Sequence, residues 1–233
     1  IYEVPQVDPM FKDPIAIKVT KQAASLEDLE KINIYRSNPT SGEFAWRTSV
    51  PKTVFGSKVD YLVEIPALAA AIFKVLSCTQ GNISIINSKG DVDARSISGK
   101  IEISNLQGDV ISATGNNTDI IIHGIAGFVK AITANGRMDF TDIKGYLDAT
   151  SQNAKITGKS IKGKVKTRSA SGQTKLTDVG YKSLDSFSQS GNLIVVLSSN
   201  VDQLTNDTIE IESGNGDIKL TLPAKIAARL MVN

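Results

Sequence analysis

Two carboxylates in the middle of the chain, Glu102 and Asp139, are the residue types that glycosidases use as acid and nucleophile. The repeat pattern of the chain places them two repeats apart on a flat surface, without the long loops that form a cleft. Three aspartates, Asp91, Asp93 and Asp109, offer oxygen atoms of the kind that divalent cations prefer. Solvated surface carboxylates explain both groups, so the sequence predicts neither catalysis nor a metal site.

The chain has one cysteine, Cys78, and one histidine, His123. A single cysteine excludes an intrachain disulfide and a cysteine metal cluster, and we expect it to be a small buried residue. A single histidine argues against a zinc site and a histidine-based triad, and a plain surface histidine is expected. We therefore predict that the protein is not an enzyme and has no cofactor.

An aromatic pair beside a basic run is the candidate binding surface. Phe128 and Tyr146 lie one repeat apart on positions expected to face outward, and the run from Lys155 to Arg168 contains no acidic residue. Such a surface suits stacking on a sugar ring and holding an acidic polysaccharide, or docking a partner protein. The predicted ligand-binding residues are Phe128, Tyr146, Lys130, Lys164, Lys166 and Arg168. The alternative is that a terminal segment packs over the two aromatic rings.

These residues belong to a repetitive stretch in which glycines recur every nine residues, beginning at Gly81, Gly90, Gly99 and Gly108. The segments between them alternate between large apolar residues and a medium residue followed by a small one. Two halves make a repeat of 18 residues, and a short fixed period of this kind indicates a solenoid. Alternation within each half indicates a β-strand with one buried face. Because parallel crossovers are right-handed, we predict a right-handed parallel β-solenoid with two strands and about 18 residues per coil.

Aligned repeats give columns of like side chains that predict the core. The large column is Ile83, Ile101, Ile120, Met138 and Ile156. The smaller columns are Val92, Val110, Val129, Leu147 and Val165, then Ala94, Ser112, Ala131, Ala149 and Thr167. Two polar ladders are expected in the turns, Ser96, Thr114, Thr133, Ser151 and Ser169, and Ser98, Asn116, Asn135, Asn153 and Ser171. One extra residue near Gly115–Thr118 and one deletion before Gly180 are the expected departures.

The flanks are less regular, and we divide the chain into a β segment over 1–75 that covers the first coil, a solenoid over 76–200, and capping strands over 201–233. Residues 1–13 are expected to be an irregular lead-in. Ser25 and the acids after it predict a short helical turn, residues 32–36 and 43–49 predict a hairpin, and 58–65 predicts a strand. The ends must be covered, because an open coil exposes an unpaired strand edge.

Composition limits the functions further. The chain has 233 residues, 41% hydrophobic residues and a net charge of +2, so no global charge points to nucleic acid or a membrane surface. No apolar run reaches the roughly 20 residues of a membrane span. The sequence begins at Ile1 rather than at methionine and contains no signal or anchor, so these residues do not by themselves indicate a location.

Three segments resemble a bacterial and archaeal family of adhesin domains of unknown function. They are Val59-Asp-Tyr-Leu-Val-Glu-Ile-Pro66, Gly90-Asp-Val-Asp-Ala-Arg-Ser-Ile-Ser-Gly99, and Ser213-Gly-Asn-Gly-Asp-Ile-Lys-Leu-Thr-Leu-Pro223. The resemblance covers roughly residues 15–225 and implies a β-helix-like domain in exported or cell-surface proteins. It implies no catalytic residues.

Four functions are compatible with these features. The leading prediction is a monomeric, non-enzymatic, extracytoplasmic module for adhesion or scaffolding at the cell surface. The second is a polysaccharide-binding module that uses the aromatic and basic surface. A polysaccharide lyase or hydrolase is disfavoured by the short turns, and a bactofilin-like polymer is disfavoured by the irregular ends.

Overall fold

The computed structural model of the protein describes residues 2–7, 16–37, 45–51, 53–54, 56–64, 74–198 and 208–224. Helix α1 (Leu26–Lys31) is short, and strands dominate. The strands are β1 (Tyr2–Val7), β2 (Ala16–Gln22), β3 (Asn33–Ser37), β4 (Ala45–Ser49), β5 (Lys58–Glu64), β6 (Lys74–Lys89), β7 (Val92–Thr133), β8 (Met138–Ser151), β9 (Ile156–Ser169), β10 (Thr174–Ser188), β11 (Leu193–Leu197), β12 (Ile209–Ser213) and β13 (Ile218–Thr221).

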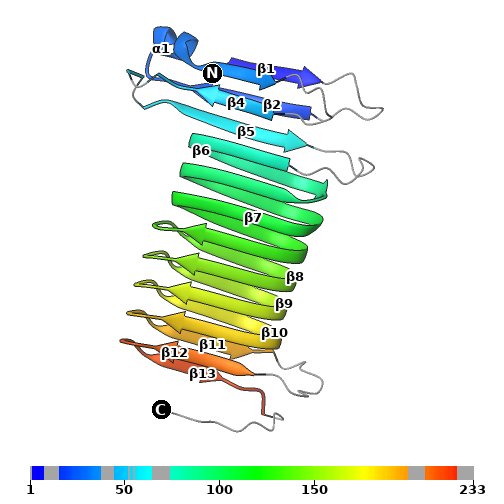
Figure 1. Cartoon of the computed structure of the whole chain (residues 1–233), viewed down its shortest axis with the longest axis vertical. Helices are drawn as coiled ribbons and strands as arrows, with labels where there is room; N and C mark the ends of the chain where they lie inside the picture. The colour runs from blue at the N-terminus through cyan, green and yellow to red at the C-terminus, as the bar shows by residue number, and fades with distance from the viewer. Residues whose placement is uncertain are drawn as a thin grey trace.

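The long strands stack as the coils of a parallel β-solenoid, which confirms the predicted fold (Figure 1). Pairing runs at a spacing of 18 residues, as between Ile83 and Ile101 and between Met138 and Ile156. There are about seven coils. Each coil contributes one strand to a first sheet, lined inside by the large residues, and one to a second sheet, lined by the smaller residues.

The core lies between the two sheets. Ile101, Ile103 and Ile120 of the first sheet are completely buried, and so are Ala94 and Ala149 of the second. Large side chains opposite small ones fill a narrow interior without voids. Burying each large aliphatic side chain contributes about 1.5–3 kcal/mol, so stability accumulates with every coil that is added.

The glycine columns are required by the close approach of successive coils. Gly99 has a φ of +132°, and a Cβ atom built on it would lie 1.9 Å from the carbonyl oxygen of Gly81 on the preceding coil. Gly145 has a φ of +133° and faces the carbonyl oxygen of Gly127 in the same way. A side chain at either position would force the coils apart.

A second column of unusual backbone lies in the turn after the first sheet and was not predicted. Its non-glycine members have φ between 52° and 54° and are Asn87, Asn105, Asp142, Ser160 and Asp178. Most of these residues have short polar side chains that tolerate the left-handed region. Gly124 takes the same conformation at φ 65°. We call this turn and the residues up to the following glycine position the first corner.

The predicted position of one extra residue was wrong. It lies at Asp109–Val110, where both backbone N–H groups donate to Asp91 Oδ1 at 2.9 Å. This arrangement is a β-bulge that absorbs one residue. Val110 is consequently 42% exposed, and Ile111 takes the buried place predicted for it. Ser112 is likewise displaced, and Ala113 is buried instead.

The same shift corrects the polar ladders. Asn135 Nδ2 donates to Asn117 Oδ1 at 3.0 Å, and Asn153 Nδ2 donates to Asn135 Oδ1 at 2.8 Å, so Asn117 replaces Asn116 in the ladder. Thr114 drops out of the other column. In the remaining column, Thr133 Oγ1 donates to the carbonyl oxygens of Asn116 and Thr118 on the preceding coil, as expected of a coil-to-coil bond. Ser151 and Ser169 differ, because each Oγ accepts from an N–H three residues further on within its own coil.

The predicted deletion before Gly180 was also wrong. Tyr181 pairs with Gly163 at the usual spacing of 18, whereas Ser183 pairs with Lys164 at a spacing of 19. Lys182 is therefore an inserted residue. Tyr181 occupies the register position that glycine holds in the preceding coils.

The N-terminal strands extend the parallel stack with antiparallel pairs. β1 pairs with β2, β2 pairs with β5, and β5 joins β6 in parallel. The irregular lead-in predicted for residues 1–13 was wrong for Tyr2–Val7, because Pro5 is tolerated on this edge strand. The helical turn is confirmed, with Ser25 Oγ accepting from the Asp28 N–H at 3.1 Å, and so is the β3–β4 hairpin.

The C-terminal strands continue the solenoid. β12 pairs in parallel with β10, and β13 with β11, so parallel pairing extends beyond the predicted range of 76–200 at this end as it does at β5. Ile209, Ile211 and Leu220 are only partly buried against the core, and Ile218 is 47% exposed. Of the capping strands predicted over 201–233, residues 201–207 and 225–233 lie outside the described residues.

Candidate functional site

The predicted aromatic pair lies on the outer face of the second sheet. Register pairs Phe128 of β7 with Tyr146 of β8, and Tyr146 with Lys164 of β9. The ring centroids are 4.9 Å apart and the planes differ by 21°, so the expected stacking on adjacent coils is confirmed. One coil spacing is about 4.8 Å, which brings like rings into contact without any distortion.

The stack uses part of the surface that a sugar would need. Each ring covers one face of the other, and both side chains are half-buried. Burial raises the pKa of Tyr146, and the carboxylates of Asp148 and Asp185 raise it further, so the phenol stays neutral. An aromatic pair of this kind contributes about 0.5–1.5 kcal/mol, which gives the rings a structural role between coils.

Lys130 and Lys166 lie in a column of alternating charge. Lys130 pairs in register with Asp148, Asp148 with Lys166, and Lys166 with Asp185. Opposite charges on neighbouring strands compensate one another. Both lysines therefore lie next to in-register carboxylates, which offset part of their charge.

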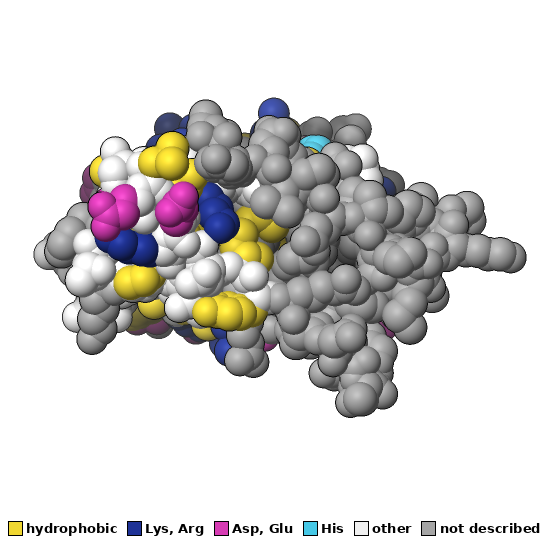
Figure 2. Space-filling model, turned by 90° about the horizontal axis from the view of Figure 1, so that it is seen from above, with side chains coloured by type: hydrophobic (Ala, Val, Ile, Leu, Met, Phe, Trp, Pro, Cys, Tyr) yellow, Lys and Arg dark blue, Asp and Glu magenta, His cyan; other side chains and the backbone are white. Residues whose placement is uncertain are grey.

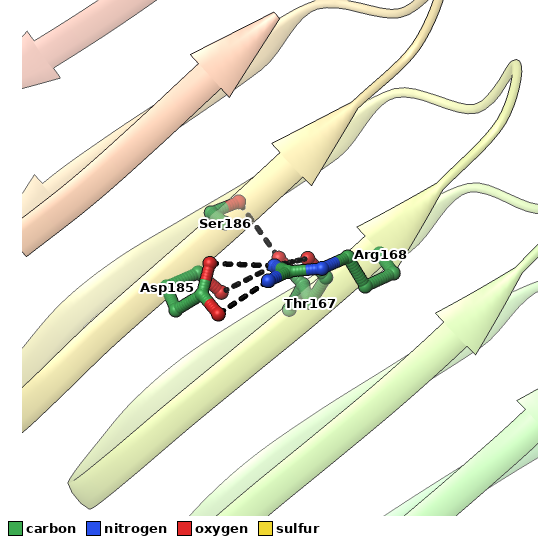
Figure 3. Close-up of polar contacts among 4 residues, drawn as sticks. All are labelled: Thr167, Arg168, Asp185 and Ser186. Carbon is green, nitrogen blue, oxygen red and sulfur yellow. Dashed lines mark hydrogen bonds and ion pairs between the residues drawn. The ribbon is translucent and has the colours of Figure 1, made fainter.

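Arg168 is held by its neighbours (Figure 3). Its guanidinium donates from Nη1 to Asp185 Oδ1 at 2.6 Å and from Nη2 to Asp185 Oδ2, and Nη1 also donates to the Thr167 carbonyl oxygen at 3.1 Å. It also lies over the Phe187 ring, 5.9 Å from the centroid. Asp185 raises the pKa of Arg168, and the paired fork leaves this side chain fixed on the protein surface.

Of the six predicted residues, the structure brings Phe128, Tyr146 and Lys164 into one column and sets Lys130, Lys166 and Arg168 beside them among carboxylates. It also brings together two lysines that were not among the predicted ligand-binding residues, although Lys162 belongs to the basic run from Lys155 to Arg168. Lys144 and Lys162 pair in register at the first corner, and both are exposed. The sequence signal that could have located them is a lysine directly before the repeat glycine in two successive coils, at Gly145 and Gly163.

The acidic candidates are engaged within the protein. Glu102 accepts from Lys100 Nζ at 2.5 Å. On a different coil from this pair, an Asp139 carboxylate oxygen lies 2.7 Å from Arg137 Nε. The two carboxylates thus belong to separate surface ion pairs.

The aspartate group is also used internally. Asp93 is paired with Arg95 at 2.6 Å, and Asp91 accepts the two backbone N–H groups of the bulge. Within the described ranges, no group of three or more metal-ligating side chains is found.

The remaining reactive side chains are placed as expected. Cys78 is buried, and burial raises the pKa of its thiol to about 11. A thiol with so high a pKa is a poor nucleophile at neutral pH. His123 is half exposed, with Nδ1 3.6 Å from Asp142 Oδ2.

Comparison of the chain with protein-family models, with curated proteins and with solved structures found no match. None of the described helical segments is long and apolar enough to cross a membrane.

Proposed function

We propose that this protein is a non-enzymatic, extracytoplasmic module for adhesion or scaffolding at the cell surface. The observation that carries the proposal is the continuous parallel register from β5 to β13, which makes a long, regular body with flat outer faces (Figure 1). Solenoids of this kind present extended surfaces, and each coil is stabilised by its neighbours.

The chemistry of those faces supports the same proposal. Glu102 and Asp139, the carboxylates best suited to hydrolysis, are each neutralised by an adjacent cation. Figure 2 shows the N-terminal end, where hydrophobic, basic and acidic side chains are interspersed on the described part of that surface. Mixed, locally compensated surfaces suit contact with another surface better than turnover of a substrate.

Attachment assays test the proposal. The full chain is coupled to beads, which are then exposed to bacterial envelope fractions, mucin-coated plastic and bare plastic. We expect retention above that of beads carrying an unrelated β-solenoid of similar charge. Equal retention on all three surfaces contradicts an adhesive role. A protein that stays intact when protease is added to intact producing cells contradicts the proposed location.

A second candidate function is polysaccharide binding through the second sheet. The stacked Phe128 and Tyr146, flanked by the exposed Lys164, favour it, because a sugar has both apolar and hydroxyl faces to match. A glycan array with the wild-type chain and with the Phe128→Ala, Tyr146→Ala variant measures it. Binding that the double variant loses supports this candidate, and an absence of any glycan signal from the wild-type chain rejects it.

A further inference from the structure

One coil of the solenoid has an unbalanced charge. Between Lys155 and Arg168 the sequence carries only basic charged residues, which are Lys155, Lys159, Lys162, Lys164, Lys166 and Arg168. Every charged neighbour along this strand is also basic, so the carboxylates that can compensate these residues are those on the coils directly above and below. The register therefore decides which of these cations are compensated.

The cations on the second sheet divide clearly. Lys166 lies between Asp148 and Asp185, and Arg168 holds Asp185 through both carboxylate oxygens. Lys164 instead lies between Tyr146 and Ser183, which carry no charge at neutral pH. Lys164, at the start of the second sheet next to the first corner, therefore has no carboxylate in register.

At that corner the cations accumulate. Lys162 lies between Lys144 and Gly180 in register. The inserted Lys182 lies on the next coil, between the residues that pair with Gly163 and Lys164, which are Tyr181 and Ser183. We name Lys144, Lys162, Lys164 and Lys182 the lysine corner. All four side chains are exposed, and within the described ranges none of them forms a side-chain hydrogen bond or an ion pair.

Acidic groups bound the lysine corner on both sides. On the second sheet they are Asp148 and Asp185. In the turn of the first sheet, Asp178 lies two residues before Gly180, the register partner of Lys162. The positive surface is therefore narrow and runs along the solenoid axis across three coils, in β8, β9 and β10. With coils about 4.8 Å apart, this spans on the order of 10 Å.

We propose that the lysine corner binds an acidic polysaccharide, with carboxylates of successive sugars lying along the solenoid axis. This inference rests on the second candidate function above and assigns its charge-recognising residues. Lysine ammonium groups are flexible point charges with three donors each, so they suit carboxylates that repeat along a chain. A narrow line of charge with acids on either side fits a single linear polyanion better than a membrane plane or a nucleic-acid duplex. The neutral Tyr146 phenol beside Lys164 adds a group suited to a sugar hydroxyl.

Titration of the full chain with polygalacturonate, followed by calorimetry, tests the proposal. The Lys162→Gln, Lys164→Gln variant is expected to bind roughly tenfold more weakly, since each exposed ion pair contributes up to about 1 kcal/mol and 1.4 kcal/mol is a factor of ten. A matched control, Lys100→Gln with Arg137→Gln on the outer face of the first sheet, removes the same charge and is expected to bind within about twofold of the wild-type chain. Added salt should weaken wild-type binding because the lysines are exposed to solvent.

Each other result overturns the assignment. Equal losses in the two variants mean that net charge alone governs binding. A larger loss for Lys130→Gln with Lys166→Gln places the site on the second sheet, and polysaccharide binding then stands while the lysine corner does not. Tighter binding to duplex DNA or to phosphatidylserine vesicles replaces the proposed ligand. No binding to polygalacturonate rejects the inference, and the attachment assays judge the adhesive role independently.

Circular dichroism of both variants verifies the fold, and Lys144→Gln with Lys182→Gln provides a second pair from the same corner.

Discussion

Two isoleucines in one column of the first sheet have very different surroundings. Ile120 lies in the middle of the solenoid and is completely buried, whereas Ile218 in β13 is 47% exposed. Both have the same residue type and the same inward register, since Leu193 pairs with Ile218 just as Ile120 pairs with Met138. Among the described strands, β13 has a parallel partner on one side only. The difference shows that burial in this fold comes from having a coil on each side rather than from position within a coil.

The largest expected effect is therefore a matched truncation in this column. Ile120→Ala should lower the free energy of unfolding by about 2–5 kcal/mol, because it removes a fully buried side chain from a close-packed column. Ile218→Ala should lower it by less than about 1 kcal/mol, because much of that side chain already contacts solvent. Urea denaturation followed by circular dichroism measures both. Equal losses would mean that Ile218 is as fully covered as Ile120 in solution.

The same column contains a defect that sharpens the comparison. Thr174 is completely buried between Ile156 and Leu193, and its Oγ1 has no hydrogen-bond partner. An unpaired buried hydroxyl costs about 1–3 kcal/mol, and valine has nearly the same shape. Thr174→Val should therefore raise the free energy of unfolding by about 1 kcal/mol, measured in the same way.

The buried Thr167 provides the control for that substitution. Its hydroxyl shares a 2.7 Å hydrogen bond with Ser186, so Thr167→Val should destabilise the protein by leaving Ser186 unpaired. If both substitutions destabilise, Thr174 has a partner in solution.

A smaller effect is expected at the surface of the middle coils. The Asn135 side chain joins its own coil to the coils on both sides, donating to Asn117 and accepting from Asn153. Asn135→Ala should lower the free energy of unfolding by about 0.5–1 kcal/mol, because exposed hydrogen bonds contribute little net energy. Asn116→Ala, which lies outside the ladder, should change it by less than about 0.5 kcal/mol. Comparable thermal shifts for the two variants would contradict a stabilising ladder.

The smallest effect is a pH dependence at the first corner. Hydrogen bonds from Ser160 and Ser198 lower the pKa of Asp178 below its unfolded value of 3.8. A carboxyl whose folded pKa is depressed stabilises the protein above the unfolded pKa and loses that contribution as the pH falls through the folded pKa. The stability difference between the wild-type chain and Asp178→Asn should therefore favour the wild type at neutral pH and shrink below about pH 4. A difference that stays constant from pH 6 to pH 3 would contradict this linkage.

The sequence predicts most of the solenoid because the residues that recur with the repeat are those that face the core. The solenoid buries the isoleucines Ile83, Ile101 and Ile120 together with the alanines Ala94 and Ala131, as their spacing predicts. The placement of the extra residue failed because Val110 and Ile111 are both β-branched and apolar. Either one suits the buried position, and only the bond pattern around Asp91 distinguishes them.

The site was predicted less completely for a related reason. Spacing of one repeat correctly placed Phe128 against Tyr146. The position of Lys166 between two aspartates depends on an insertion, because Asp185 follows Lys166 at a spacing of 19 rather than 18. A deletion had been expected there, and this error in register concealed which lysines lack an acidic neighbour.

Both single-residue insertions in the described coils fall at the same seam, directly after the glycine position where the first corner leads into the second sheet. One is taken up by the bulge at Asp109–Val110, and the other is Lys182. In each case the inward residues return to phase within the same strand, as Ile111 and Leu184 show by their burial. The protein can thus gain residues and change the charge at this outer edge while the register of its core stays the same. Surface chemistry and folding can therefore evolve separately.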